Sequence, residues 1–76
     1  MNQTHAHGAR SVVTTASGHI VRCESSQNGE NIVNIITVDG VLHSQDCINA
    51  QGGWTDAETE ARTEAECVAE ELEATA

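Results

Sequence analysis

Three histidines of this 76-residue chain could take part in metal binding. His5 and His7 have the spacing of two ligands, and His43 or a cysteine would have to complete the set. No closed ligand pattern surrounds them, so we expect no metal and no cofactor. A small zinc-binding protein stays open as an alternative.

The three cysteines are an odd number, and their spacing is wide. Cys23, Cys47 and Cys67 match no CxxC pattern of a metal or redox site. Without an export signal, such cysteines are typical of free thiols in a reducing cytoplasm. We expect Cys23 and Cys47 to lie on separate strands, too far apart for a disulfide.

Residues typical of catalysis occur close together in one place only. His43, Ser44 and Asp46 are the residue types of a hydrolase triad. Neighbouring residues of a strand point to opposite faces, so His43 and Ser44 would face apart. The pair Gly52-Gly53 lacks the strand–GxGxxG–helix context of a phosphate-binding loop. The sequence therefore predicts a protein that is not an enzyme.

Two hairpin signals organise the middle of the chain. Asn28-Gly29 and Asp39-Gly40 are dipeptides that favour two-residue turns, and β-branched residues flank both. They predict a three-stranded antiparallel β-meander over about residues 19–47. Residues 1–10 contain little that can be buried and are expected to form a flexible arm. Residues 11–76 are expected to form a single small α+β domain.

The spacing of apolar residues changes after Trp54 and becomes helical. Thr55 precedes Glu58 in a capping-box pattern, and a C-terminal amphipathic helix is predicted over about residues 56–73. One stripe of this helix would be buried, and it consists of Ala57, Ala61, Ala65, Val68 and Leu72. Trp54 would either cover the end of the core or anchor a partner.

Strand alternation predicts two apolar faces for the sheet. The face that we expect the helix to cover carries Val21, Cys23, Ile32, Ile36, Val38, Val41 and Cys47. The other face carries Ile20, Val33, Ile35 and Leu42, which we expect to form the dimer face of a homodimer, because the chain has no second helix to cover them. A register slip of one residue would exchange the two faces.

The strongest signal is acidic. The chain has 12 acids, three arginines and no lysine, for a net charge of −9. Such a charge repels phosphate, so we expect no direct binding to nucleic acid or to a membrane. The helical segment holds eight of the acids, and the expected partner-binding residues are Glu60, Glu64, Glu66, Glu70, Glu71 and Glu73. These carboxylates either dock on a basic surface or only solubilise the chain.

In its small size, paired hairpins and Glu-rich segment TDAETEARTEAECVAEELE, the chain resembles the small acidic inhibitors of phages and mobile elements, including anti-CRISPR proteins and DNA mimics. The resemblance implies a cytoplasmic, non-enzymatic inhibitor that binds a basic nucleic-acid-binding protein or complex. The order of sheet then helix is also similar to the HicB-like antitoxin core. The alternative function is therefore an antitoxin-like or assembly module that binds through sheet faces or edges.

Overall fold

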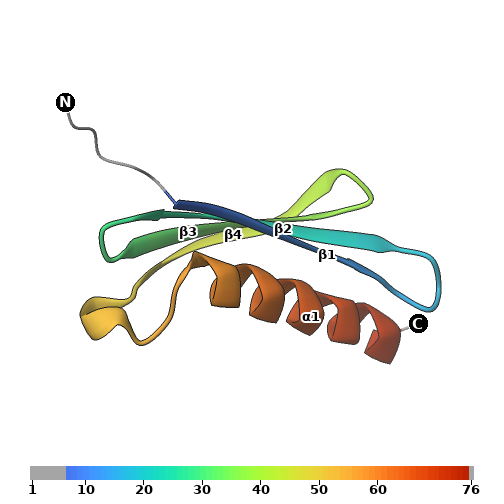
Figure 1. Cartoon of the computed structure of the whole chain (residues 1–76). Coiled ribbons are helices and arrows are strands. Elements are labelled where there is room, and N and C mark those ends of the chain that lie inside the picture. Colours follow the sequence, from blue (N-terminus) through green and yellow to red (C-terminus); the bar gives the residue numbers. More distant parts are fainter. Residues whose placement is uncertain (1–6, 76) are drawn as a thin grey trace.

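The computed structural model describes residues 7–75, in which an antiparallel sheet carries one long helix on one face (Figure 1). The elements in chain order are β1 (His7–Thr14), β2 (Ile20–Asn28), β3 (Asn31–Val38), β4 (Val41–Asn49), the 3-10 helix η1 (Gln51–Gly53) and α1 (Ala57–Thr75). The strands lie in the order β1-β2-β3-β4. The predicted α+β class is confirmed, but the sheet has four strands rather than three.

The strand outside the predicted three-stranded meander is β1. It pairs with β2 along its whole length, with Val13 opposite Val21. It contributes few large side chains, but its backbone groups satisfy those of β2, which would otherwise form a sheet edge. Residues 7–10 of the expected arm belong to this strand, and residues 1–6 lie outside the described residues.

The first hairpin turns one residue later than expected. Asn28 pairs with Asn31, so Gly29 and Glu30 form the turn, and Gly29 supplies the positive φ of 65°. A glycine at the first turn position is typical of a type II′ hairpin. Cys23 consequently pairs with Ile36 instead of Asn34. The difference is two residues along the strand, so every side chain keeps its predicted face.

The second hairpin has the predicted turn but contains a bulge. Asp39 and Gly40 both have positive φ, 53° and 84°, as a type I′ turn requires. The register shifts between Thr37 and Ile36, so Ile36 pairs with Ser44 rather than with His43. A bulge of this kind exchanges the faces of all later residues of the strand.

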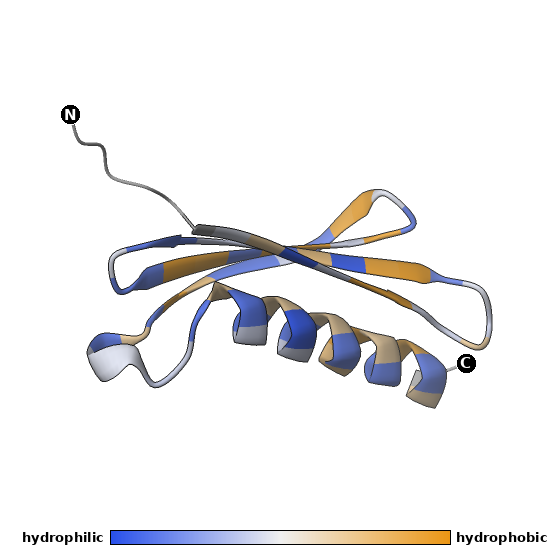
Figure 2. Cartoon of the chain, viewed as in Figure 1, coloured by the Kyte–Doolittle hydropathy of each residue, from blue (hydrophilic) through white to orange (hydrophobic). Residues whose placement is uncertain are grey.

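Because of the bulge, the observed core face differs from the predicted one at residues of β4. Val21, Cys23, Ile32 and Ile36 are buried as predicted, and Val38 is half-buried. Cys47 lies instead opposite Val33 and is exposed, and Val41 near the turn is 69% exposed. Hydropathy colouring shows the corresponding apolar segments along β2 and β3 and at the β3–β4 hairpin (Figure 2).

The helix α1 packs against β1, β2 and β3 through its predicted stripe, of which Leu72 is half-buried and the other four residues are buried. The cap differs from the prediction. Asp56, not Thr55, accepts a hydrogen bond from the backbone of Thr59 at 2.8 Å, and Gln27 accepts one from the backbone N–H of Ala57. Within residues 7–75, no helix is long and apolar enough to cross a membrane.

Replacement of Ile36 tests the assignment of the covered face. Ile36→Ala is expected to lower the free energy of unfolding by about 2–5 kcal/mol, most of the stability of so small a domain, because it removes a side chain between sheet and helix. Val41→Ala should change it by no more than about 0.5 kcal/mol. Urea unfolding followed by circular dichroism measures both, and equal losses would contradict the assignment.

Candidate functional site

The glutamates predicted to bind a partner occupy different environments on α1. Glu60 is buried, and its two carboxylate oxygens accept hydrogen bonds from Asn34 Nδ2 at 3.0 Å and Thr55 Oγ1 at 3.2 Å. A carboxylate held in this way joins the helix to the sheet. Glu60 is therefore a structural residue and is not part of the exposed acidic surface.

Asn34 is the centre of this buried polar network. Its amide nitrogen also donates to Asp46 Oδ1 at 2.9 Å, and its carbonyl oxygen accepts from the hydroxyl of Ser25. In the part of the chain that the structure describes, every buried side-chain nitrogen and oxygen has a hydrogen-bond partner. This network was not predicted, although a polar Asn34 within the apolar run NIVNIITV was a signal for it.

Glu64 lies one helical turn beyond Glu60, on the flank of α1 that faces β4. Burial raises the pKa of Glu64 above its ordinary value of 4.5, and the carboxylates of Asp46, Glu60 and Glu71 raise it further. This flank therefore concentrates negative charge at an energetic cost to the folded chain.

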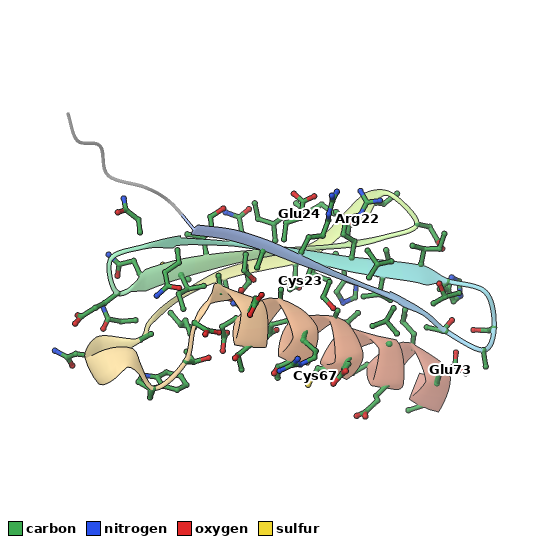
Figure 3. All side chains as sticks on the ribbon, viewed as in Figure 1. Arg22, Cys23, Glu24, Cys67 and Glu73 are labelled. Carbon is green, nitrogen blue, oxygen red and sulfur yellow. The ribbon has the colours of Figure 1, made fainter. Side chains whose placement is uncertain are left out.

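The remaining acids face solvent. Glu66, Glu70, Glu71 and Glu73 are exposed along the second half of α1. The hydroxyl of Ser17, in the β1–β2 turn, donates to Glu73 at 2.7 Å and lowers the pKa of that carboxyl. Figure 3 shows Glu73 near the C-terminal end of the helix. The exposed acidic surface of α1 is defined by Glu66, Glu70, Glu71 and Glu73.

Trp54 does not cover the core, since it is 67% exposed between η1 and α1. The predicted dimer face is exposed on the side of the sheet away from α1. Ile20, Ile35 and Leu42 are 46%, 38% and 60% exposed, and Val33 is half-buried.

In the described part of the chain, the candidates for metal binding form no cluster, whereas two of the three catalytic residue types share one face of the sheet. Among residues 7–75, no group of three or more histidine, cysteine or acidic side chains has a metal-binding arrangement, and His5 lies outside those residues. Cys23, Cys47 and Cys67 are free thiols, as expected. The bulge leaves Ser44 and Asp46 on the face of the sheet that carries α1.

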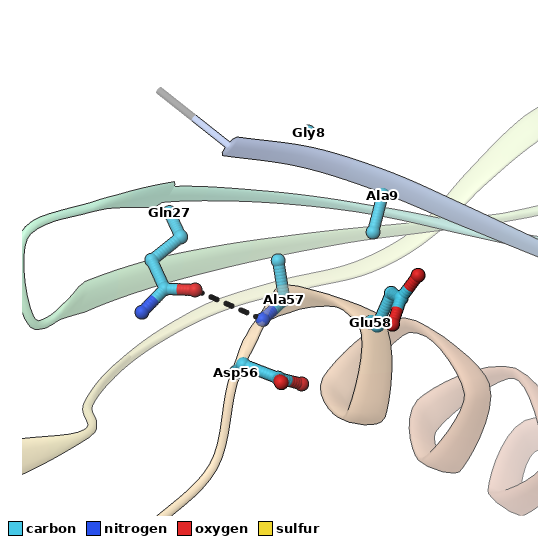
Figure 4. A pocket seen from close by; sticks show the side chains of 6 residues that line it. All are labelled: Gly8, Ala9, Gln27, Asp56, Ala57 and Glu58. Atoms are coloured by element: carbon cyan, nitrogen blue, oxygen red, sulfur yellow. Dashed lines mark hydrogen bonds between the residues drawn. The ribbon is translucent and has the colours of Figure 1, made fainter. Parts of the chain in front are cut away.

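A pocket at the start of α1 offers few groups that could bind a ligand. It is lined by Gly8, Ala9, Gln27, Asp56, Ala57 and Glu58 (Figure 4). Gln27 Oε1 accepts from the backbone of Ala57, and Asp56 accepts from the backbone of Thr59. Gln27 and Asp56 are thus already used in holding the helix, which leaves the carboxylate of Glu58 as the exposed charged group of the pocket.

Comparisons with protein-family models, with curated proteins and with solved structures find no match to this chain.

Removing the carboxylate of Glu60 tests its structural role. Glu60→Ala leaves buried donors of Asn34 and Thr55 without an acceptor, and we expect a loss of about 1–3 kcal/mol in the free energy of unfolding. Glu60→Gln keeps one amide oxygen and should cost less. The control Glu66→Ala, on the exposed side, should stay within about 0.5 kcal/mol. Equal stability of the Glu60→Ala and Glu66→Ala proteins would contradict the role.

The shifted carboxyls predict opposite effects of pH. The folded chain holds the proton of Glu64 more tightly than the unfolded chain does. Protonated Glu64 therefore makes its whole contribution to the free energy of unfolding below the ordinary pKa of 4.5. This contribution is lost as pH rises through the raised pKa. Glu64→Gln should be more stable than the original chain at neutral pH, with a difference that shrinks in acid.

Glu73 supplies the matched control, because its pKa is lowered. Its contribution is present above the ordinary pKa and is lost as pH falls through the lowered value. Glu73→Gln should therefore be less stable than the original chain at neutral pH. Denaturant unfolding of both variants over a pH series measures this, and shifts of the same sign would refute the assignment.

Proposed function

We propose that this chain is a non-enzymatic inhibitor or interaction protein whose acidic helix occupies a basic, nucleic-acid-binding surface of a partner. The single observation that carries the proposal is the exposed acidic surface along one side of α1. Glu66, Glu70, Glu71 and Glu73 are exposed, whereas Glu60 is buried and holds the helix to the sheet through its hydrogen bonds.

The charge density of α1 supports a partner that normally binds nucleic acid. The helix has 19 residues and is therefore about 28 Å long. Without Glu60 it carries six glutamates and Arg62, a net charge of −5, or about one negative charge per 6 Å. One strand of duplex DNA carries one per about 3.4 Å. A groove lined with Arg and Lys would thus meet a charge density about half that of a DNA strand.

The acidic surface does not stabilise the helix that carries it. Glu66 and Glu70 repel each other at i,i+4, which costs about 0.2–0.5 kcal/mol. The last turn has no basic residue to balance the helix dipole. A basic partner would relieve this repulsion, and it would also favour ionisation of Glu64. Exposed Trp54, at the other end of α1, adds a side chain of the type that anchors interfaces.

A second candidate function has its own support. Leu42 and Ile20 are exposed on the sheet, and all residues of β4 except Ile48 are exposed. These features suit an antitoxin-like or assembly module that binds through a sheet face or edge, with charge serving solubility. It predicts that binding depends on apolar rather than acidic side chains.

Neutralising two exposed glutamates separates the two functions. The double variant Glu66→Gln, Glu70→Gln removes two negative charges and one like-charge contact, so the fold should be retained. We expect it to weaken capture of a basic partner at least about tenfold, because each buried or close charge pair is worth one or more kcal/mol. Affinity should also fall steeply with salt, and duplex DNA should compete.

The matched control is Glu30→Lys, which changes the net charge by the same two units at the β2–β3 turn. Immobilised chain variants would be compared by titration of the same purified partner, identified first by mass spectrometry. Equal affinity of the double variant and the original chain would refute the proposal. Loss with Leu42→Ser alone would instead favour the sheet-binding module.

A further inference from the structure

We propose that the face of the sheet opposite α1 joins two copies of this chain in a symmetric dimer, with Arg22 of each copy over Glu24 of the other. We call this surface the outer face. Its aliphatic side chains are Val12, Ile20, Val33, Ile35 and Leu42, and its charged side chains are Arg10, Arg22 and Glu24.

The outer face is apolar and receives a residue from every strand. Val12 in β1, Ile20 in β2 and Leu42 in β4 are between 46% and 60% exposed. Ile35 in β3 is 38% exposed. Exposed aliphatic side chains on every strand of one sheet face, with Arg22, Glu24 and Thr37 among them, are typical of a surface that binds a protein. The single helix is already used on the other face.

The charges of the outer face identify a second copy as the occupant. The face has two arginines and one glutamate, a net charge of +1 on a chain of −9. Arg10 and Glu24 lie 3.8 Å apart, but Arg22 forms no ion pair with any residue in the described range 7–75. In a symmetric dimer, Arg22 of each copy can form an ion pair with the exposed Glu24 of the other copy across the two-fold axis.

The register of the strands gives the position of that axis. Arg22 and Glu24 flank Cys23 on β2 and point away from α1, whereas Cys23 lies between sheet and helix (Figure 3). A two-fold axis across the strands at the level of Cys23 stacks the two sheets with their strands antiparallel. Each Arg22 then lies over Glu24 of the second copy. The two acidic helices lie on the far sides, where their repulsion is weakest.

The area of the outer face is sufficient for a weak dimer. Four strands of eight or nine residues, at about 3.3 Å per residue and 4.8 Å between strands, give a face of about 500 Å². Two copies would bury about 1,000 Å², which is the lower limit for a specific interface. Pairing through the edge of β4 alone would bury much less. The face, not the edge, is therefore the interface.

A charge swap tests this arrangement. Light scattering and sedimentation at concentrations in the tens of micromolar should give twice the chain mass of 8.0 kDa. Arg22→Glu places like charges together twice in each dimer and should weaken association about 100-fold. The double variant Arg22→Glu, Glu24→Arg recreates both pairs and should restore the dimer. Leu42→Glu should give a folded monomer.

The control Arg62→Glu makes the same charge change on α1 and should leave association unaltered. Circular dichroism establishes that each variant is folded. A folded monomer for the original chain would overturn the proposal and leave the outer face to a different partner. A dimer that survives Arg22→Glu, or a double variant that stays monomeric, would overturn the pairing of Arg22 with Glu24.

Discussion

The hydrogen bonds of Asn34 fix the helix to the sheet and thereby set the exposure of every other residue on α1. The buried amide donates to Glu60 on the helix and to Asp46 on β4; the bond to Glu60 is buried, and the bond to Asp46 is partly buried. An unsatisfied group there would cost about 1–3 kcal/mol, so the helix cannot rotate freely about its axis. Each residue of a helix is turned by about 100° from the last. With Glu60 held inward at one flank, Glu66 and Glu70 must point away from the sheet.

This constraint separates the molecule into two chemically different sides. The acids of α1 collect on one side, and two of the three arginines collect on the other with the aliphatic residues of the outer face. The alanine stripe permits a close approach of the helix, so a thin core suffices to hold the two sides together. A basic partner and a second copy would therefore approach from opposite directions and would not compete for the same surface.

Patterns with a local physical cause could be predicted from the sequence. The alanine stripe predicted α1, and Asp39-Gly40 predicted the β3–β4 turn, because each of these elements depends on neighbouring residues alone. The turn at Gly29 and Glu30 was missed by one residue, since the same glycine suits the second position of an Asn-Gly type I′ turn and the first position of a type II′ turn. The bulge near His43 depends on how β4 lies against β3, and β1 depends on pairing with β2. For the same reason the helical spacing predicted α1 but could not reveal Asn34 as the partner of Glu60.

The buried polar network also explains why the sheet uses one of its two apolar faces for the helix. Hydrophobic area alone does not decide, since Val33 and Ile35 on the outer face are as apolar as Ile32 and Ile36 on the inner one. A slip of β3 by one residue would exchange these pairs at little cost in apolar burial. It would also carry Asn34 to the outer face and leave buried Glu60 with Thr55 as its remaining donor, which is unfavourable for a charged group. A buried polar residue can specify register in this way, as single polar residues do in coiled coils. The network in this small core therefore selects the register, while the aliphatic residues supply most of the stability.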